Sequence, residues 1–564
     1  MHADLWRWML VDKGKRRGGT NGSGTGTSTS ASSDEEDRVE SLHKVDCEGE
    51  VKLLSCTDAP PGAAIPSIRQ SYRYYRFIVI VPLVYMALLA LSFSLDLGSV
   101  AAKVWVSVFK ASGPALRGLF SLGSCLEPLR RLAVLLFAAK SYDGSARHGA
   151  KLAEKQLKLR HIVVVPAYKE PVAVLRRTLE SLPRKPDPET SEHAVHVVLA
   201  MEAKDTTHAA TFDELNKLFG NSFASFQMTL HTMLPHERPG KGSNENFSLR
   251  SLQAELIVAG VDPWEVMVTV CDADSVFAPG FFVALESAYF GQLDGRRLIY
   301  SAPRNTYRNF GKLWNPLISA QECSLNSSDL LVDFTEPYEN YSNYSMLMGY
   351  AAELDFWDPE VIPEDFHMVY KAMICSRGAQ SVCRVWSLIS NDTVTEFHDR
   401  YVQAKRHMWG VTNIAWIAAI LRHAPFSVDR IWYLLLKSYA AEMSEALTPS
   451  FALMMILSLG VWYRPPADAR APDAFMFLGA MTLIRCLLQW LVFFIGEAWV
   501  WRRLMVSLGQ DLERPSWCQV AWHYGLMPVA QPIAGFIFGN VACWHAVCSA
   551  FWSSEFEYVT APKA

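Results

Sequence analysis

The sequence predicts an α/β domain with a mostly parallel sheet, flanked by transmembrane helices. Between residues 155 and 425, short runs rich in Val and Ile alternate with longer stretches of helical pattern. This alternation is typical of parallel sheets whose strands are joined by crossover helices. Long apolar runs occur before and after this region, as in chains that cross a membrane. The first 66 residues follow neither pattern.

Size and composition exclude several classes of protein. The chain has 564 residues and 50% hydrophobic residues, which is enough for a large core and more than one structural unit. Its formal net charge of −4 gives no overall positive field of the kind that nucleic-acid-binding proteins use, so we expect no nucleic-acid partner. The 11 cysteines are scattered and never in CxxC spacing, which indicates neither a disulfide framework nor a zinc cluster.

The N-terminal part divides into a tail and a membrane segment. Residues 1–66 are rich in Gly, Ser, Thr and charged residues, a composition that cannot bury enough apolar surface to fold, and we expect a disordered tail. Residues 67–140 form the N-terminal membrane segment, in which 77–95 carries no charge and is long enough to span a bilayer. The run 119–140 has charged residues at its centre and fits an interfacial or re-entrant element.

The C-terminal part, residues 426–555, contains three further apolar runs, 447–463, 474–496 and 524–552. We interpret them as interfacial and transmembrane helices. Lys and Arg concentrate between residues 103 and 160, which places the domain of residues 155–425 on the cytoplasmic side of the membrane. We therefore expect an integral membrane protein of the plasma membrane or the Golgi, with the lipid bilayer as a partner.

The first strand of the α/β domain is expected over 160–168 and the first helix over 171–182. Pro166 ends the hydrogen-bonded part of the strand, so Tyr168, Lys169 and Glu170 follow at its carboxyl end. Ligands bind at this edge of open parallel sheets, and Tyr168 could lie against a planar base there. An ordinary junction between strand and helix explains the same residues. The second strand is expected over 196–202.

The third strand, 266–274, ends in two carboxylates one residue apart, Asp272 and Asp274. Side chains at i and i+2 of an extended segment point the same way, so both carboxylates would face one region. Two hard oxygen ligands suit Mg²⁺ or Mn²⁺ better than zinc, and a cation would make the paired acids tolerable. In the alternative interpretation, Asp274 caps the helix expected within 275–290.

Two further motifs combine charge with small or helix-starting residues. Lys241 stands between two glycines in "PGKGSN", where the backbone can approach a phosphate while the ammonium supplies charge. Pro363 can start a helix whose first turn carries Glu364 and Asp365. An acid in this position can act as a general base in a cleft, although a plain acidic first turn explains it equally well.

The last motif is "QAKRHMWG", in which Gln403 and Arg406 share one helical face and Trp409 follows one turn later. These side chains could border a binding site. In the alternative interpretation, this is a basic helix close to the membrane that uses its tryptophan as an interfacial anchor.

In order, the series "VVVPAYKEP", "VVLAMEAKD", "PGKGSN", "VTVCDADS", "PEDFHM" and "QAKRHMWG" resembles the membrane-bound members of glycosyltransferase family 2. That group contains the cellulose, chitin and hyaluronan synthases, and the similarity covers roughly residues 160–412. The resemblance implies a GT-A fold, a nucleotide-sugar donor, a divalent metal on an aspartate pair, a catalytic aspartate, and a motif containing Gln, Arg and Trp on the acceptor and product side.

The resemblance also implies roles for particular residues. The donor-binding residues would be Tyr168, Glu170, Glu202, Asp205, Lys241 and Asp272. Asp274, with Asp272, would hold Mg²⁺ or Mn²⁺. Asp365 would be the catalytic base with Glu364 beside it, and Gln403, Arg406 and Trp409 would border the acceptor. The chain departs from the family pattern in two places, because Pro363 stands where the family has threonine and His407 follows Arg406.

The function expected from the sequence is an inverting, metal-dependent transfer of a sugar. The donor would be a nucleotide sugar, with a UDP-sugar expected, and the acceptor a hydroxyl of a glycan or lipid at the cytoplasmic membrane face, as in polysaccharide synthesis. Two alternatives stay open. "VTVCDADSV" also fits the nucleophile motif of haloacid-dehalogenase-type phosphatases, and a membrane protein of this size could be a transporter or scaffold without enzymatic activity.

Overall fold

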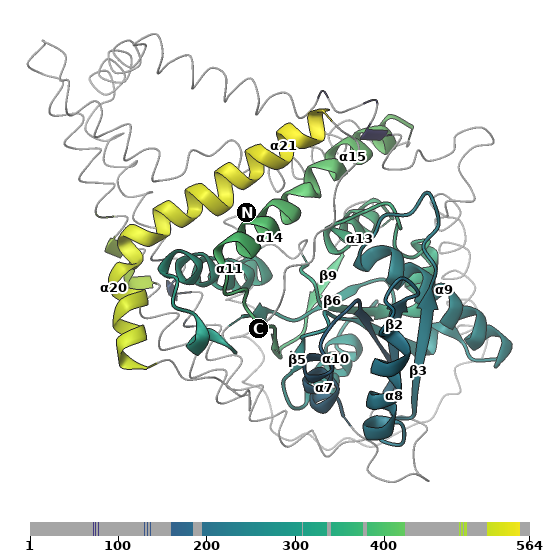
Figure 1. Ribbon diagram of the computed structural model, residues 1–564. Helices are drawn as coiled ribbons and strands as arrows, with labels where there is room; N and C mark the ends of the chain where they lie inside the picture. The colour runs from purple at the N-terminus through teal and green to yellow at the C-terminus, as the bar shows by residue number, and fades with distance from the viewer. Residues whose placement is uncertain are drawn as a thin grey trace, which may run out of the picture. The chain divides into compact units, whose positions relative to one another are not determined.

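The computed structural model describes residues 159–183, 195–306, 308–335, 340–375, 381–423 and 516–552, with isolated positions near residues 71–77, 129–136 and 484–492 (Figure 1). All of them belong to one compact unit, Ser55–Ala564. Outside the continuously described ranges lie the predicted tail 1–66, the predicted spans 77–95, 447–463 and 474–496, and the interfacial or re-entrant element predicted over 119–140.

The main sheet has seven strands in the order β3-β2-β1-β4-β8-β6-β9. Strand β1 (Arg160–Ala167) lies between β2 (Val195–Glu202) and β4 (Val266–Val270), and β3 (Ser225–His231) extends the sheet beyond β2. The pairs β3–β2, β2–β1 and β1–β4 are all parallel. The prediction of a mostly parallel α/β sheet is confirmed, although β3 was not predicted, because its polar sequence lacks a β-branched run.

The remaining strands are short and were not predicted. β8 (Tyr344–Leu347) pairs antiparallel with both β4 and β6 (Ile299–Ser301), and β9 (Val382–Arg384) is parallel to β6. A second sheet joins β5 (Val276–Phe277), β10 (Ile389–Ser390) and β7 (Arg304–Asn305). These pairings bring the segments before β8 and after β10 next to the end of β4, where the candidate site lies.

Nine helices were identified between residues 172 and 423 of the described chain. They are α7 (Val172–Ser181), α8 (His208–Phe219), α9 (Lys241–Val258), α10 (Phe281–Phe290), α11 (Pro316–Thr335), α12 (Met348–Glu353), α13 (Glu364–Cys375), α14 (Phe397–His407) and α15 (Val411–His423). Helices α8 and α9 both pack on β2 and β3. The apolar run Ile162–Val165 in β1 is almost completely buried, as expected for a central parallel strand covered on both faces.

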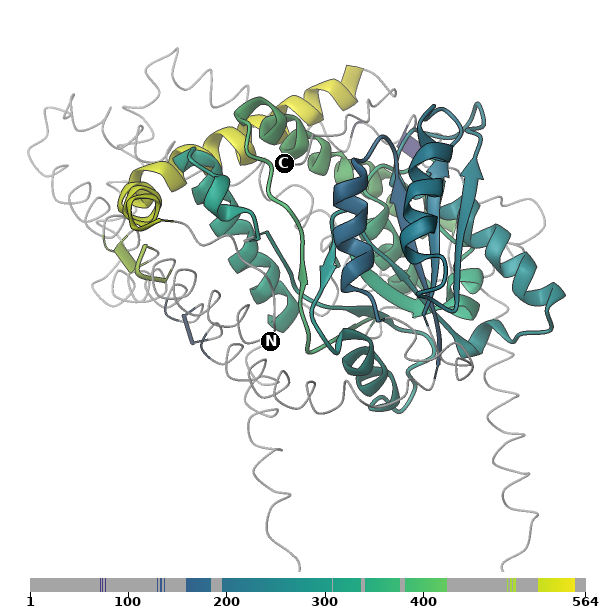
Figure 2. The same cartoon turned by 60° about the horizontal axis from the view of Figure 1, so that its bottom comes forward.

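The C-terminal described segment is one continuous helix made of α20 (Trp517–Ala534), a π-helical stretch (Gly535–Val541) and α21 (Ala542–Trp552). It changes direction between α20 and α21 (Figures 1 and 2), and the π-helical stretch together with Pro528 and Pro532 accounts for the bend. One side packs on the α/β domain, where His523 Nε2 lies 2.7 Å from the carbonyl oxygen of Leu313.

The predicted helix over 524–552 is therefore confirmed. Within the described residues, Trp517–Trp552 is the one helix long and apolar enough to cross a membrane, with a mean hydropathy of 1.4. Half of its most apolar window is buried inside the protein. Since core helices of soluble proteins share this composition, the helix is weak evidence for a membrane span.

Candidate active site

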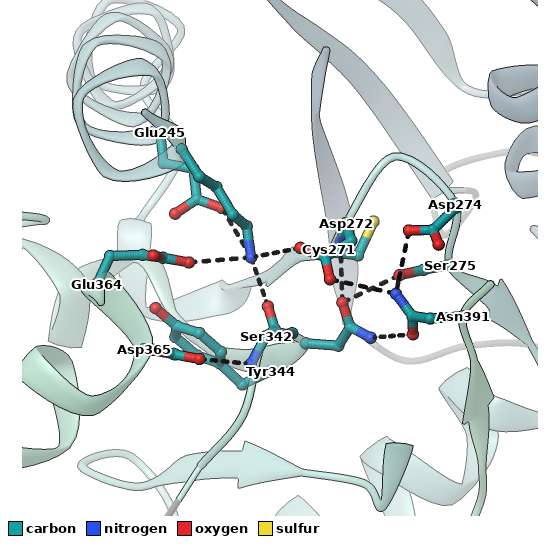
Figure 3. Close-up of polar contacts among 12 residues, drawn as sticks. Glu245, Cys271, Asp272, Asp274, Ser275, Ser342, Tyr344, Glu364, Asp365 and Asn391 are labelled. Atoms are coloured by element: carbon teal, nitrogen blue, oxygen red, sulfur yellow. Dashed lines mark hydrogen bonds and ion pairs between the residues drawn. The ribbon is translucent and has the colours of Figure 1, made fainter. Parts of the chain in front are cut away.

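The ammonium of Lys241, the first residue of α9, lies at the centre of the site. Its Nζ is 3.1 Å from Glu364 Oε1, 3.3 Å from Asp272 Oδ1 and 3.6 Å from Glu245 Oε1, and it donates a hydrogen bond of 2.6 Å to the carbonyl oxygen of Ser342 (Figure 3). Burial alone would lower the pKa of Lys241, but the three carboxylates outweigh it and raise the pKa well above its usual value. The lysine therefore stays charged.

The structure explains why both residues that flank Lys241 in the "PGKG" motif are glycines. Gly240 has φ 154°, a conformation that residues with a Cβ rarely adopt. A Cβ on Gly242 would lie 3.1 Å from Glu364 Cβ and 3.3 Å from the carbonyl oxygen of Val361. The missing side chain therefore lets the first turn of α9 approach the start of α13, which brings Lys241 to Glu364.

Glu245 belongs to the site but was not predicted. It is fully buried, and neither carboxylate oxygen has a hydrogen-bond partner among the described residues. Burial raises its pKa well above the usual value, Lys241 opposes this shift, and Glu364 and Asp272 add to it. The sequence contained a signal, because Glu245 follows Lys241 by four residues and thus shares its helical face.

The prediction of a helix starting after Pro363 with an acidic first turn is confirmed by α13. Glu364 is 7% exposed. Burial is the main cause that raises its pKa to about 7, with Lys241 lowering it and Asp365 raising it. The carboxylate of Asp365 accepts a hydrogen bond of 2.8 Å from the Ser342 amide at Oδ2 and one of 2.9 Å from the Phe366 amide at Oδ1.

The two aspartates after β4 converge, though not as predicted. β4 ends at Val270, so Asp272 and Asp274 lie in a turn rather than in an extended strand, and the i, i+2 argument was wrong for this segment. They converge because the Asn391 side-chain amide donates to Asp272 Oδ2 and to Asp274 Oδ1, each at 3.2 Å. Asp274 does not cap α10, whose N-cap is Gly280.

Two asparagines fix the turn that contains Asp272 and Asp274, which we call the aspartate turn. The main-chain amide of Asp272 donates to Asn343 Oδ1 at 2.9 Å, and Asn343 Nδ2 donates to Asn391 Oδ1 at 3.0 Å. Since a backbone N–H can only donate, it sets the orientation of both side-chain amides, and Asn391 must present its amino group to the two carboxylates. An amide donor thus makes the paired acids tolerable in this structure.

Asp274 is completely buried, and hydrogen bonds from Asp392 and Arg308 stabilise it. Its Oδ2 accepts a hydrogen bond of 2.8 Å from the Asp392 amide. Arg308 donates to the Asp274 carbonyl at 3.0 Å and pairs with Asp392 at 2.7 Å. Asp272 is the more accessible of the two acids, with 22% of its side chain exposed.

The predicted donor-binding residues after β1 and β2 lie on two connected loops. Lys169 has a left-handed backbone, with φ 57°, and its amide donates to Asp205 Oδ2 at 2.8 Å. Burial alone would raise the pKa of Asp205, but the hydrogen bonds from Thr207 and Lys169 outweigh it and lower the pKa. Asp205 thereby ties the loop of the half-buried Tyr168 and Glu170 to the end of β2.

Glu202, the last residue of β2, is 7% exposed, and burial raises its pKa. Its carboxyl lies close to His231 and Lys204, both of which lower the pKa in opposition to burial. The structure therefore places Glu202 at the carboxyl end of the parallel strands, where the sequence predicted it.

The predicted acceptor residues are on α14 and just beyond it. Gln403 and Arg406 are both half-buried, and Arg400 donates to Gln403 Oε1 at 2.5 Å. Helix α14 ends at His407, and Trp409 lies in a 3₁₀ turn, buried in an apolar cluster with Val411 and Cys543. The regular helical spacing expected from Gln403 to Trp409 is thus interrupted.

The ring of His407 faces mostly positive charge. His407 itself is exposed, and the positive charges of Arg406, Arg400 and Arg304 lower its pKa. Asp272 acts in the opposite direction. The last turn of α14 therefore lies within electrostatic reach of the aspartate turn.

No protein-family model matches the chain, and no curated protein matches it. The chain is similar to the solved structure of the mannosyltransferase PcManGT from Pyrobaculum calidifontis in complex with GDP-Man and Mn²⁺, with 14% identity, a TM-score of 0.36, and coverage of 67% of this chain and 99% of that one. It is also similar to GalNAc-T7 with UDP, GalNAc and Mn²⁺, with 15% identity, a TM-score of 0.31, and coverage of 53% and 59%. Likeness at these TM-scores does not establish a function.

Proposed function

We propose that this chain is a glycosyltransferase that moves a sugar from a nucleotide-diphosphate sugar to a hydroxyl group. The observation that supports this most directly is the position of Ser342, whose main-chain carbonyl accepts a hydrogen bond from Lys241 and whose main-chain amide donates one to Asp365. Ser342 thereby holds two groups in one site. The ammonium of Lys241 can bind a diphosphate, and the carboxylate of Asp365 can accept a proton. Asp272 lies beside them, at the carboxyl end of a parallel strand.

Each group has a task in the transfer. The leaving nucleoside diphosphate develops negative charge as the glycosidic bond breaks, and the ammonium of Lys241 stabilises it. Asp365 accepts the proton of the acceptor hydroxyl while the hydroxyl oxygen attacks the anomeric carbon of the donor sugar. Attack from the face opposite the leaving group inverts the anomeric configuration.

The aspartate turn fits a hard divalent cation in the kind of donor atoms it offers. An oxygen of Asp272 and one of Asp274 lie within 3.2 Å of the same amide nitrogen, and carboxylate oxygens suit Mg²⁺ or Mn²⁺. Among the described residues, no group of three or more His, Cys, Asp or Glu is arranged to hold a metal, so the two aspartates with the diphosphate would be the ligands. Such a cation would neutralise charge on the leaving group.

The remaining predicted residues keep their proposed roles. Tyr168, Glu170, Glu202 and Asp205 would surround the nucleoside, because the loops after β1 and β2 lie at the ligand-binding edge of the sheet. Gln403, Arg406 and Trp409 would border a glycan or lipid acceptor. Similarity to family 2 and transfer at the cytoplasmic face of a membrane belong to the same proposal.

The test is donor-resolved binding and transfer by the full-length protein in detergent micelles. UDP-glucose, UDP-N-acetylglucosamine, UDP-glucuronate and GDP-mannose are titrated calorimetrically with Mn²⁺, and label from each donor is followed into glycan and lipid fractions of added membranes. We expect one donor to bind and to be transferred. Binding by none of the four would contradict the proposal.

Two variants separate the roles within this experiment. Asp365→Asn should abolish transfer and leave donor binding nearly intact, whereas Asp274→Asn should remove the Mn²⁺-dependent part of binding. Asp213→Asn, on the exposed face of α8, is the matched control. Phosphate release from a generic phosphate ester is measured in parallel, because an Asp272-dependent release without sugar transfer would favour the phosphatase alternative.

A further inference from the structure

Ser342 lies in an unusual turn immediately before β8. Its φ is 51°, and the Asn343 amide donates to the Tyr341 carbonyl at 2.5 Å, which closes a three-residue γ-turn centred on Ser342. A γ-turn with positive φ is rare and strained for a residue other than glycine. Backbone strain of this kind persists only where surrounding contacts hold it.

Three groups of Ser342 contact three different side chains of the site. Its carbonyl accepts from Lys241 Nζ at 2.6 Å, its amide donates to Asp365 Oδ2 at 2.8 Å, and its hydroxyl accepts from Arg304 Nη1 at 3.1 Å. Figure 3 shows Ser342 between Glu364 and Asp365 on one side and the aspartate turn on the other. The residue thus lies between the two halves of the site.

The next residue anchors the turn. Asn343 is fully buried, and its Oδ1 accepts from the Asp272 amide at 2.9 Å and from Ser275 Oγ at 3.0 Å. A movement of the γ-turn would therefore shift Asn343 relative to the aspartate turn. The strained turn at Ser342 is therefore held by the aspartate turn through Asn343 and by α13 through Asp365.

We propose that Ser342 is a positioning residue for the transfer, because its left-handed γ-turn fixes the carboxylate of Asp365 relative to Lys241 and the aspartate turn. The inference rests on the proposed function. Within the described part of the chain, Asp365 accepts hydrogen bonds only from the Ser342 amide and the neighbouring Phe366 amide. Lys241, by contrast, has three carboxylates around it. Losing the turn therefore disturbs the base more than the lysine.

The test compares variants that differ in their tolerance of positive φ. Ser342→Gly adopts the turn without strain and keeps both main-chain contacts, but it loses the hydroxyl contact with Arg304, so kcat should fall only about two- to fivefold. Ser342→Val keeps the same main-chain groups but strongly disfavours positive φ. Its kcat should fall on the order of a hundredfold, as expected for a misplaced catalytic group, while the donor KM changes less than about fivefold.

The control is Asp355→Val. Asp355 also has a left-handed backbone, with φ 56°, and its side chain is half exposed in a pair with Arg250. This variant carries the same backbone conflict outside the site, so its stability should fall while kcat per donor-binding site stays at the wild-type value. The number of donor-binding sites, measured by calorimetry, corrects each kcat for misfolded protein.

A double variant completes the test. If Ser342 acts through Asp365, then adding Ser342→Val to Asp365→Asn should cause almost no further loss. The inference is overturned if kcat falls equally in Ser342→Val and Ser342→Gly. It is also overturned if kcat per donor-binding site falls as much in Asp355→Val as in Ser342→Val. Failure of the proposed function looks different, because the wild-type protein itself would then bind and transfer no donor.

Discussion

Lys241 Nζ lies 3.1 Å from Glu364 Oε1 and thereby joins the first turn of α9 to the first turn of α13. The two residues come from motifs that look independent in the sequence. Their contact brings the cation proposed for the diphosphate next to the acids proposed for the acceptor.

Replacing Lys241 should weaken donor binding through its diphosphate. Lys241→Met removes the ammonium but keeps an unbranched side chain, and the loss of a charged hydrogen bond lowers affinity by about 10- to 100-fold. The measurement is calorimetric titration with whichever of the four donors binds the wild-type protein, and with the free nucleoside of that donor. Affinity for the nucleoside should change little, and Lys217→Met on the exposed part of α8 should bind the donor as the wild type does.

The buried carboxyl of Glu364 should make stability depend on pH. Its pKa in the folded protein is about 7, against 4.5 as its ordinary value, so between these pH values the folded state binds more protons than the unfolded state. The free energy of unfolding therefore falls as pH rises from 4.5 to 7. Glu364→Gln removes this contribution. The decrease in the free energy of unfolding between pH 5 and pH 8 should therefore be smaller in this variant than in the wild type, by at least about 1 kcal/mol.

This prediction is checked by urea denaturation at both pH values. Glu214→Gln, an exposed position on α8, serves as the control and should reproduce the wild-type drop. An unchanged drop in Glu364→Gln would show that the carboxyl is already ionised at pH 5.

The contact between Gly242 and Glu364 should not tolerate a methyl group. A Cβ 3.1 Å from Glu364 Cβ forces a displacement, and overpacking of this size costs about 1–2 kcal/mol. Gly242→Ala should therefore be less stable in urea and should transfer sugar more slowly. Gly525→Ala, where nothing lies within 4 Å of the added Cβ, should be neutral or slightly stabilising because alanine favours a helix. Equal effects of the two variants would contradict the close approach.

Asp358 holds the segment that precedes α13. It pairs with Lys371 at 3.3 Å and with the buried His367. Although burial alone would raise its pKa, these two partners lower it. Asp358→Asn leaves a buried ammonium without its carboxylate and should cost about 2–4 kcal/mol. Asp355→Asn, in an exposed pair with Arg250, should cost less than about 1 kcal/mol. Thermal unfolding of both variants gives the comparison, and similar costs would show that the Asp358 pairs add little.

Local patterns in the sequence correctly predicted many of the elements. The Val-rich runs of β1 and β2, the start of β4 and the helices α7 and α13 appear where the pattern indicated, because hydrophobic periodicity and helix-starting residues act over a few neighbours. Short motifs also singled out Lys241, which stands between two glycines, and Asp365, which lies in the acidic first turn after Pro363. Predicted site roles remain predictions, and the membrane spans outside the described residues were not tested.

Other site residues could not be predicted from local pattern. Ser342, Asn343 and Asn391 are single polar residues in short loops, and Arg304 lies in a two-residue strand. Periodicity does not apply to segments of this length. The antiparallel pairing of β8 with β4 and the pairing of β10 with β7 bring them to the aspartate turn.

The sequence by itself determined that β1, β2 and β4 form strands, that α7 and α13 form helices, and which chemical types of residue lie at their ends. Only the tertiary structure decided that the Asn391 side-chain amide bridges the two aspartates and that one strained residue, Ser342, links Lys241 to Asp365. The physical reason is range. Secondary structure follows from contacts between residues a few positions apart, whereas the site depends on hydrogen bonds between groups that meet only after the whole sheet has assembled.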